Sequence, residues 1–188
     1  MDRDGTLNEQ MGYINHISRF ILLPGAAEAI RLLNTHDHLA IIISNQSGIA
    51  RGYFPIELVN QVHDRMRTLL KKEGARIDGI FFCPHHRMGI VPEYSVTCDC
   101  RKPETGLITK ACNAFDIDMA NSYVIGDRQT DIELAHKAKL KAILVSTGYG
   151  LGEIDHVLPH SDLKPAYIAR DLLHGVRWIL NKTQPSKE

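Results

Sequence analysis

Short apolar runs alternate along the chain with longer segments in which apolar residues recur every three or four positions. The runs have strand length and cover residues 39–43, 79–82, 123–125 and 142–145, with 166–168 as a possible edge strand. Continuous apolar runs are typical of parallel strands that helices cover on both faces. The pattern therefore predicts an α/β fold with a Rossmann-like, doubly wound and mostly parallel sheet.

Five segments carry apolar residues at the spacing of an amphipathic helix. They are residues 26–33, 55–72, 107–115, 132–138 and 172–180. A proline precedes the first of them, where the first turn of a helix tolerates it. Their alternation with the apolar runs predicts helices on both faces of the sheet.

The length and charge of the chain indicate how many domains it forms and which kinds of partner it does not favour. A chain of 188 residues suits one domain, and we expect residues 1–188 to form it, with a frayed end at residues 183–188. Lys and Arg together number 22, as do Asp and Glu, so no excess charge indicates a nucleic-acid or membrane surface. The chain has no run of about 18 apolar residues and no N-terminal signal segment, which predicts a cytoplasmic protein.

Polar and small residues follow several of the predicted strands. Residues 44–52 follow the first strand, Cys83 the second, and Gly126 with Asp127 the third. In an open α/β sheet, ligands bind beyond the carboxyl ends of the strands. We therefore expect these segments to converge, together with residues 2–6, on one edge of the sheet.

The opening segment Asp2-Arg3-Asp4-Gly5-Thr6 has two carboxylates two residues apart. Like charges this close repel unless a cation lies between them, so the segment suits Mg²⁺. With the metal bound, Asp2 can attack phosphorus as a carboxylate nucleophile, and Asp4 can give a proton to the leaving oxygen and later take one from water. Similar segments also open calcium loops and ordinary turns, so this one alone does not decide the chemistry.

Residues 44–52 offer the Ser44 hydroxyl and successive backbone N–H groups as a phosphate cradle. A polar turn that caps the next helix is the alternative, and it is favoured for this stretch taken alone. Lys102 could neutralise phosphate oxygens, and Arg101 could bind a second anionic group, although such a pair is usually solvated surface.

Residues 126–131 close an apolar strand and start a helix. This position places Asp127 near the metal and leaves Asp131 able to orient its neighbours. The alternative is an ordinary helix cap, because Asp and Thr are favoured there.

Three cysteines and one histidine form a second group of candidate ligands, as two pairs separated by the twelve residues 86–97. The group consists of Cys83, His85, Cys98 and Cys100. Three thiolates and an imidazole satisfy the tetrahedral preference of Zn²⁺, and such four-ligand sites are structural. Reduced surface thiols are the alternative in a reducing cytosol. The fourth cysteine, Cys112, lies on an apolar stripe and is expected to be a small core residue.

Together these motifs resemble those of the haloacid dehalogenase superfamily of phosphotransferases. Residues 2–6 are similar to its first motif, Ser44 to its second, Lys102 to its third and residues 126–131 to its fourth. Within the superfamily, the chain most resembles the zinc-containing D-glycero-D-manno-heptose 1,7-bisphosphate 7-phosphatases. The Ser-Asn-Gln-Ser-Gly-Ile-Ala-Arg-Gly and Cys-Asp-Cys-Arg-Lys-Pro segments carry this resemblance, which runs nearly end to end.

The resemblance implies a role for each matching residue. Asp2 would be the nucleophile and Asp4 the general acid/base of a phosphatase that works through an aspartyl phosphate. Ser44 and Lys102 would hold the transferred phosphoryl group. The implied metal ligands are Asp2, Asp4 and Asp127 for Mg²⁺, and Cys83, His85, Cys98 and Cys100 for Zn²⁺. The residues implied to bind substrate are Gln10, Met11, Gly12, Tyr13, Ser44, Asn45, Gln46, Ser47, Arg101 and Lys102.

The family also implies a nearly capless fold, in which the zinc loop, residues 83–100, takes the part of a cap domain. The implied substrate is a small sugar bisphosphate of nucleotide-activated heptose and lipopolysaccharide biosynthesis. We expect a monomer that binds neither nucleic acid nor a membrane.

Two other functions are open. The related histidinol-phosphate phosphatases share the first motif and the Cys-Asp-Cys-Arg-Lys-Pro segment, but generally have a shorter loop between the zinc-ligand pairs; the twelve residues here favour the heptose enzyme. The other alternative, from a different class, is a zinc-stabilised interaction module that has lost catalysis.

The start of the chain departs from the family pattern. Family members carry an apolar strand before the first aspartate, whereas only Met1 precedes Asp2 here. A nucleophile needs a rigid mount, because small misplacements cost large factors in rate. We therefore expect the natural start to lie upstream, and we expect weak stability and poor activity if the 188 residues are the whole product.

Overall fold

Five parallel strands form within residues 1–183, the part of the chain that the computed structural model describes. They are β1 (Ile41–Asn45), β2 (Gly79–Cys83), β3 (Tyr123–Gly126), β4 (Lys141–Val145) and β5 (Tyr167–Ala169). β1 pairs with β2, and β3, β4 and β5 form a second parallel group in that order. Each predicted apolar run corresponds to one of these strands, with β5 at an edge as expected, so the predicted α/β fold is confirmed.

The first predicted strand, residues 39–43, starts two residues too early. Leu39 is 43% exposed, and the Ala40 N–H donates to the Asp78 side chain at 2.8 Å. The chain therefore joins the sheet only at Ile41 and continues to Asn45.

All five predicted helices form. They are α1 (Ala26–Thr35), α2 (Ile56–Lys72), α3 (Gly106–Ala114), α4 (Gln129–Lys137) and α6 (Leu172–Thr183). Shorter helical segments are η1 (Ile17–Arg19), η2 (Pro92–Tyr94), η3 (Met119–Asn121), α5 (Gly150–Gly152), η4 (Glu153–Val157) and η5 (Leu158–His160). Thr183 closes α6, and the rest of the expected frayed end, residues 184–188, lies outside the described residues. None of the helices found in residues 1–183 combines the length and apolarity that crossing a membrane requires.

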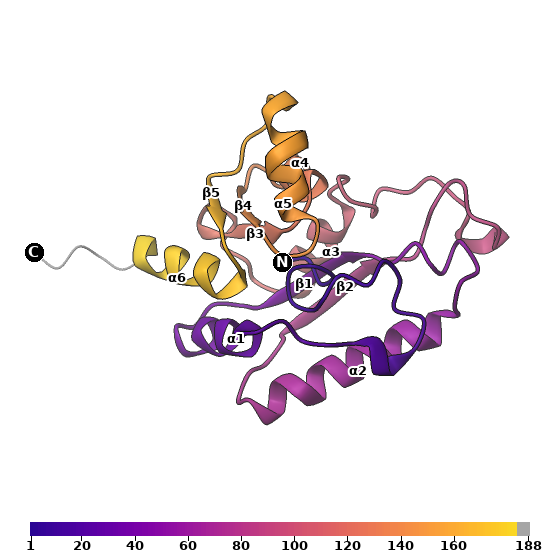
Figure 1. Ribbon diagram of the computed structural model, residues 1–188, viewed down its shortest axis with the longest axis horizontal. Helices are drawn as coiled ribbons and strands as arrows, with labels where there is room; N and C mark the ends of the chain where they lie inside the picture. Colours follow the sequence, from indigo (N-terminus) through magenta and orange to yellow (C-terminus); the bar gives the residue numbers. More distant parts are fainter. Residues whose placement is uncertain (184–188) are drawn as a thin grey trace, which may run out of the picture.

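Helices cover both faces of the strands. On one face, buried side chains of α1, α2 and α6 pack with Ile125 of β3 and Ile143 of β4. On the other face, buried side chains of α3 and α4 pack with the neighbouring residues Val124 and Leu144. Successive side chains of a strand point to opposite faces, which explains this division. Figure 1 shows α1 and α2 below the strands and α4 above them.

Met1 and Asp2 join the two groups of strands. The Met1 amino group donates to Ile41 O at 2.8 Å, and Ile43 N donates to Met1 O at 2.8 Å. On the other side, Asp2 N donates to Ile125 O at 2.8 Å. The N-terminus therefore lies between β1 and β3, in the middle of the molecule (Figure 1). These two residues occupy the position of a central strand and place Asp2 at its carboxyl end.

A cavity of about 350 Å³ continues from Met1 between β1 and β3. Its lining includes Ile41 of β1, Tyr123 of β3, Ile108 of α3 and Ile179 of α6, so it reaches from one helical layer to the other. Burial, together with the charge of Lys102, lowers the pKa of the Met1 amino group to about 6. The space behind the N-terminus is therefore a gap in the core of the sheet.

Candidate active site and metal centre

The carboxyl ends of the strands bring the predicted site segments together. Asn45 ends β1, Cys83 ends β2 and Gly126 ends β3. Asp2 lies beside the end of β3, because its N–H donates to Ile125 O. The expected convergence at one edge of the sheet is confirmed.

Three buried carboxylates meet at this edge. Asp2, Asp127 and Asp131 each place an oxygen within 4.8 Å of the others. Asp127 is fully buried, and its Oδ1 has no hydrogen-bond partner within residues 1–183. Burial and the nearby charge of Asp2 raise the pKa of Asp127 to about 7, and burial also raises the pKa of Asp2. A divalent cation would relieve both effects, so these oxygens fit the ligand preference of Mg²⁺.

The acidic group differs from the predicted Mg²⁺ ligands in one member. The prediction grouped Asp4 with Asp2 and Asp127, whereas the structure gathers the carboxylate of Asp131 with those two. Asp131 was expected to orient its neighbours, and it accepts a hydrogen bond from Lys102 Nζ at 2.7 Å. The part of Asp4 in metal binding stays a prediction.

Lys102 is buried between two of these carboxylates. Its Nζ lies 2.9 Å from Asp2 Oδ1 and 2.7 Å from Asp131 Oδ1. Burial favours the neutral amine, but the charges of Asp131 and Asp2 outweigh it and raise the pKa of Lys102. The ammonium is therefore charged and adjacent to the predicted nucleophile, where it can meet the oxygens of an entering phosphate.

The residues after β1 are tied to the rest of the site. Ser44 is buried, and its Oγ accepts a hydrogen bond from Gln46 Nε2 at 2.8 Å. The Asn45 side chain donates to Lys102 O at 3.1 Å and accepts from Lys102 N at 3.0 Å. The Asn45 side chain thus ties the end of β1 to the loop that carries Lys102, whereas the Gln46 side chain contacts Ser44. The predicted contact of Asn45 and Gln46 with substrate stays a prediction.

The Asp4 carboxylate is held by three neighbouring side chains. Arg3 Nη2 lies 2.8 Å from Oδ1 and 2.7 Å from Oδ2. Asn8 Nδ2 donates to Oδ1 at 3.0 Å, and Gln46 Nε2 donates to Oδ2 at 2.8 Å. Burial opposes ionisation, but the Arg3 charge and these hydrogen bonds outweigh it and lower the pKa of Asp4. The carboxylate of the predicted general acid/base is therefore ionised, and the contacts to both of its oxygens hold it in one orientation.

Gly5 lets the opening segment pack directly against Asp127. Its φ is +86°, a region that favours glycine, and a Cβ at this position would lie 2.1 Å from Asp127 Oδ2. A larger residue here would displace the carboxylate, so the glycine of the first motif is a packing requirement of the site.

A segment after β4 also belongs to the site, although it did not stand out in the sequence. Tyr149 N donates to Asp127 Oδ2 at 2.8 Å, and Thr147 Oγ1 donates to Gly5 O at 2.6 Å. The sequence feature that could have indicated this segment is its position at the carboxyl end of an apolar run, with a glycine at 148. Arg3 and His63 were also missed, since an arginine between two aspartates and a histidine on a helix have no distinguishing pattern.

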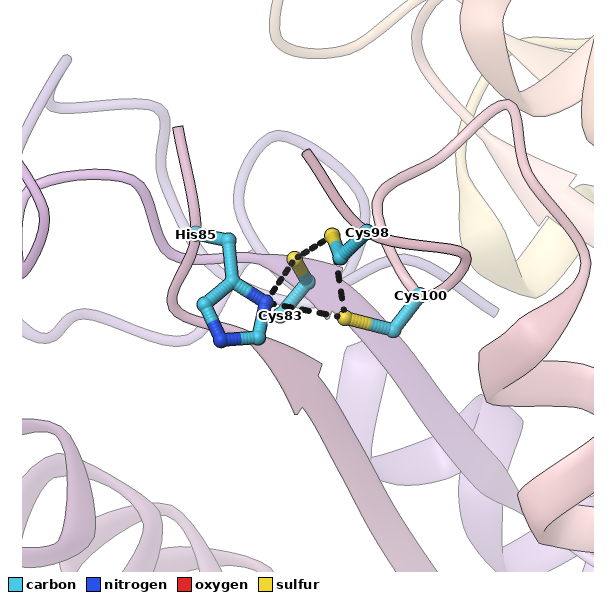
Figure 2. A group of neighbouring side chains, drawn as sticks. All are labelled: Cys83, His85, Cys98 and Cys100. Carbon is cyan, nitrogen blue, oxygen red and sulfur yellow. Dashed lines mark hydrogen bonds between the residues drawn. The ribbon is translucent and has the colours of Figure 1, made fainter. Parts of the chain in front are cut away.

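The predicted zinc ligands form a compact group, as Figure 2 shows. Cys98 Sγ lies 3.5 Å from Cys83 Sγ and 3.3 Å from Cys100 Sγ. His85 Nδ1 lies 3.8 Å from Cys83 Sγ and 3.3 Å from Cys100 Sγ. Zn–S bonds of about 2.3 Å give a tetrahedron with edges of roughly 3.8 Å. The four atoms therefore fit one Zn²⁺ ion with small adjustments.

Cys112 lies apart from this group. It is half-buried, packs against the core formed by α3 and α4, and donates to Met119 Sδ at 3.5 Å. Its predicted place on the apolar face of a helix is confirmed, although part of the residue remains exposed.

We expect Cys98→Ser to abolish zinc binding and lower the melting temperature, because a zinc ion held by this group would join β2 to the loop before α3. A loss of a few kcal/mol corresponds to a fall of roughly 5–10 °C for a chain of this size. Zinc content by mass spectrometry and a thermal melt measure both effects. Cys112→Ser is the matched control and should keep the metal. Equal zinc content in the two variants would contradict the assignment.

The remaining predicted substrate residues, 10–13 and Arg101, make contacts of their own within the protein. Gln10 Oε1 accepts a hydrogen bond from Gly12 N at 2.9 Å, and the Tyr13 ring packs edge-on to Tyr53 at 4.8 Å. Arg101 Nη1 donates to His85 O at 3.3 Å, which ties it to the zinc loop. Met11 packs against the main core. The roles of residues 10–13 and Arg101 in substrate binding stay predictions.

Comparison with known proteins gives one consistent family. The HAD-hydrolase-like family model matches residues 99–174. The D-glycero-D-manno-heptose-1,7-bisphosphate 7-phosphatase of Thermosynechococcus vestitus is 39% identical over 189 residues, which cover 98% of this chain and 96% of the relative. The D-glycero-beta-D-manno-heptose-1,7-bisphosphate 7-phosphatase of Escherichia coli is 39% identical over 149 residues, covering 79% of this chain and 78% of the relative.

Solved structures that resemble this chain come from the same family of phosphatases. D,D-heptose 1,7-bisphosphate phosphatase from B. bronchiseptica, complexed with magnesium and phosphate, matches with a TM-score of 0.84 and 32% identity, covering 97% of both chains. The enzyme of the same name from Burkholderia thailandensis has a TM-score of 0.68 and 28% identity, covering 95% of both chains.

Proposed function

Because this chain belongs to the haloacid dehalogenase-like family of heptose bisphosphate phosphatases, we propose that it hydrolyses the 7-phosphate of D-glycero-D-manno-heptose 1,7-bisphosphate in nucleotide-activated heptose biosynthesis. The observation that supports this most is the gathering of Asp2, Asp127, Asp131 and the Lys102 ammonium at the strand ends. Carboxylates, a buried cation and a metal site together fit in-line phosphoryl transfer.

Asp2 is the proposed nucleophile. One of its carboxylate oxygens forms a bond to phosphorus while the bond between phosphorus and the sugar oxygen breaks, which gives an aspartyl phosphate. Water then attacks this phosphorus, the bond to Asp2 breaks, and inorganic phosphate leaves. The proximity of Lys102 Nζ, 2.9 Å from Asp2 Oδ1, supports this role because the ammonium can balance the charge that the phosphate brings.

Asp4 is the proposed general acid/base. It gives a proton to the departing sugar oxygen and takes one from the attacking water. Its three hydrogen-bonding neighbours fix the direction of the carboxylate, which supports the role because proton transfer depends on distance and angle. They also lower its pKa, so the ionised carboxylate is ready to take a proton from water, and it must itself be protonated before it gives one to the sugar oxygen.

Ser44 and Lys102 are proposed to hold the nonbridging oxygens of the transferred group. The proposed ligands of Mg²⁺ are Asp2, Asp4 and Asp127, with Asp131 beside them. Bound there, Mg²⁺ would neutralise charge on the phosphoryl group. The proposed ligands of Zn²⁺ are Cys83, His85, Cys98 and Cys100, and that ion would be structural.

Phosphate release from the α and β anomers of heptose 1,7-bisphosphate, with and without Mg²⁺, tests the function. We expect Mg²⁺-dependent turnover and, because the name of the E. coli relative specifies the β compound, a preference for the β anomer. Histidinol phosphate serves as the competing substrate. A higher kcat/KM for histidinol phosphate would contradict the proposed substrate, and zinc-loaded protein without any phosphatase activity would favour a noncatalytic module.

Arg101 is the residue we propose for recognition of the second phosphate. No carboxylate within residues 1–183 forms an ion pair with it. We expect Arg101→Ala to raise KM for the bisphosphate about tenfold or more, the scale of a lost charge-assisted contact. KM for a simple monophosphate should change little. Arg65→Ala, on the exposed side of α2, is the control; equal effects of Arg101→Ala on both substrates would contradict this role.

The organisation of the protein follows from the same proposal. We propose that residues 1–188 act as one domain and as a monomer, with the zinc loop, residues 83–100, in the part of a cap. Free cysteines at the zinc site are consistent with a reducing compartment, so we propose that the reaction takes place in the cytoplasm.

A further inference from the structure

His63, on α2, lies in the interior and takes no part in the chemistry described above. Its side chain is 4% exposed, and its Nε2 lies 3.2 Å from Arg3 Nη1, sixty residues away in the chain. The ring also packs edge-on to Phe82 of β2, with 5.4 Å between the ring centres. These contacts fix the imidazole between a helix, a strand and the opening motif.

The protonation state of His63 follows from its partner. Arginine has only donors and stays charged, so Nε2 must accept the hydrogen bond and the ring proton must lie on Nδ1. Burial and the Arg3 charge lower the pKa of His63 to about 3, which keeps the ring neutral. The neutral imidazole therefore satisfies one end of a guanidinium that is itself only 1% exposed.

The other end of the same guanidinium holds Asp4. Nη2 contacts both carboxylate oxygens, at 2.8 and 2.7 Å, and Nε contacts Oδ1 at 3.2 Å. A guanidinium is planar and rigid, so the direction in which Nη1 is held also sets the direction of Nη2 and Nε, the two nitrogens that contact Asp4. His63 thus anchors the group that orients Asp4.

We propose that His63 is a positioning residue for the Asp4 carboxylate and acts through the Arg3 guanidinium. The role depends on the proposed function of Asp4 as the acid that protonates the departing sugar oxygen. A buried Nη1 without an acceptor would turn toward another partner or recruit water. The hydrogen bonds from Arg3 Nη2 and Nε to the Asp4 carboxylate would then become longer and less well aligned. The position of a proton donor would then be lost while the substrate-binding groups stay in place.

The test compares two variants of similar size. His63→Leu removes the acceptor, whereas His63→Gln places an amide oxygen at about the same reach. We measure kcat and KM for the heptose bisphosphate and for p-nitrophenyl phosphate, whose phenolate leaves without a proton. We expect His63→Leu to lower kcat/KM for the sugar phosphate about tenfold, a fraction of what a general acid supplies. The effect on kcat/KM for p-nitrophenyl phosphate should be less than about twofold, because kcat/KM reports the formation of the aspartyl phosphate and that step needs no acid when a phenolate leaves.

His63→Gln should restore kcat for the sugar phosphate, and KM should change little in either variant. Gln61→Leu, at an exposed position on the same helix, controls for changes in α2, and thermal melts establish that each variant folds. An equal loss of kcat/KM on both substrates, no loss of kcat/KM with His63→Leu, or a loss with His63→Gln as large as with His63→Leu would overturn the proposal.

A measurement without turnover separates this proposal from the proposed function. Nitrogen NMR of the imidazole in the full chain should show a neutral ring with the proton on Nδ1 between pH 5 and 8. A proton on Nε2 would overturn the positioning role whatever the substrate. Turnover of p-nitrophenyl phosphate without turnover of the heptose bisphosphate would instead contradict the proposed substrate; a short alkyl phosphate such as glycerol phosphate would then take its place in the comparison.

Discussion

Asp2→Asn is expected to reduce phosphate release at least about a thousandfold, because the amide cannot form the aspartyl phosphate. The substitution keeps the size of the side chain and the hydrogen bond from Asp2 N to Ile125 O, which a main-chain group makes. It also leaves Lys102 paired with Asp131 at 2.7 Å. The measurement is initial-rate phosphate release at saturating Mg²⁺.

Two further variants show whether the loss of activity depends on the position of the carboxylate. Asp64→Asn, exposed on α2, should retain full activity. Asp4→Asn should also be strongly impaired, since the proposed acid and base would be missing. Zinc content should match the parent chain in all three proteins, and thermal melts should show that each one folds, with the largest fall in melting temperature for Asp4→Asn, which removes the charge paired with the buried Arg3. If Asp2→Asn and Asp4→Asn both turn over bisphosphate at the parent rate, the enzyme interpretation is wrong.

Adding about six to eight apolar residues before Met1 is expected to stabilise the protein, because a strand of that length fills the cavity between β1 and β3. Cavities cost about 24 cal/mol per Å³, so filling about 350 Å³ sets an upper limit of about 8 kcal/mol. Half of this limit would raise the melting temperature by about 10 °C for a chain of this size. The extension also replaces a buried amino group with a peptide N–H that can keep the hydrogen bond to Ile41 O.

The control for the extension is a Gly/Ser segment of the same length, which cannot fill an apolar cavity and should change the melting temperature little. Because Asp2 follows Met1 directly, the apolar extension should also raise kcat by fixing the nucleophile more firmly. Equal melting temperatures and equal turnover of the extended and parent chains would show that this space contributes little, and would contradict the expected weakness of the 188-residue chain.

Much of the fold could be predicted because the apolar pattern is local. Each apolar run became a strand and each helical segment a helix, since burial of one face is what both patterns require. The errors lie at element ends, where single contacts decide. The strand expected to begin at residue 39 begins at Ile41, because the Ala40 N–H donates its hydrogen bond to the Asp78 side chain and not to a neighbouring strand.

The candidate site could be predicted in part for a similar reason. Strand ends of a parallel sheet share one edge, so Asp2, Ser44 and Asp127 had to meet there once the strands were placed. The grouping of the four candidate zinc ligands was predictable because few other arrangements use three thiols and an imidazole in two close pairs.

By itself, the sequence determined the fold class, the edge of the sheet that carries the chemistry and the residue types available there. Only the tertiary structure decided which of these side chains touch. It brought Asp131 to Asp2 and Asp127, turned the Asp4 carboxylate to Arg3, and placed His63 behind that arginine. The physical reason is that periodicity and spacing report burial and direction along the chain, whereas contacts between residues sixty positions apart depend on how helices pack against the sheet.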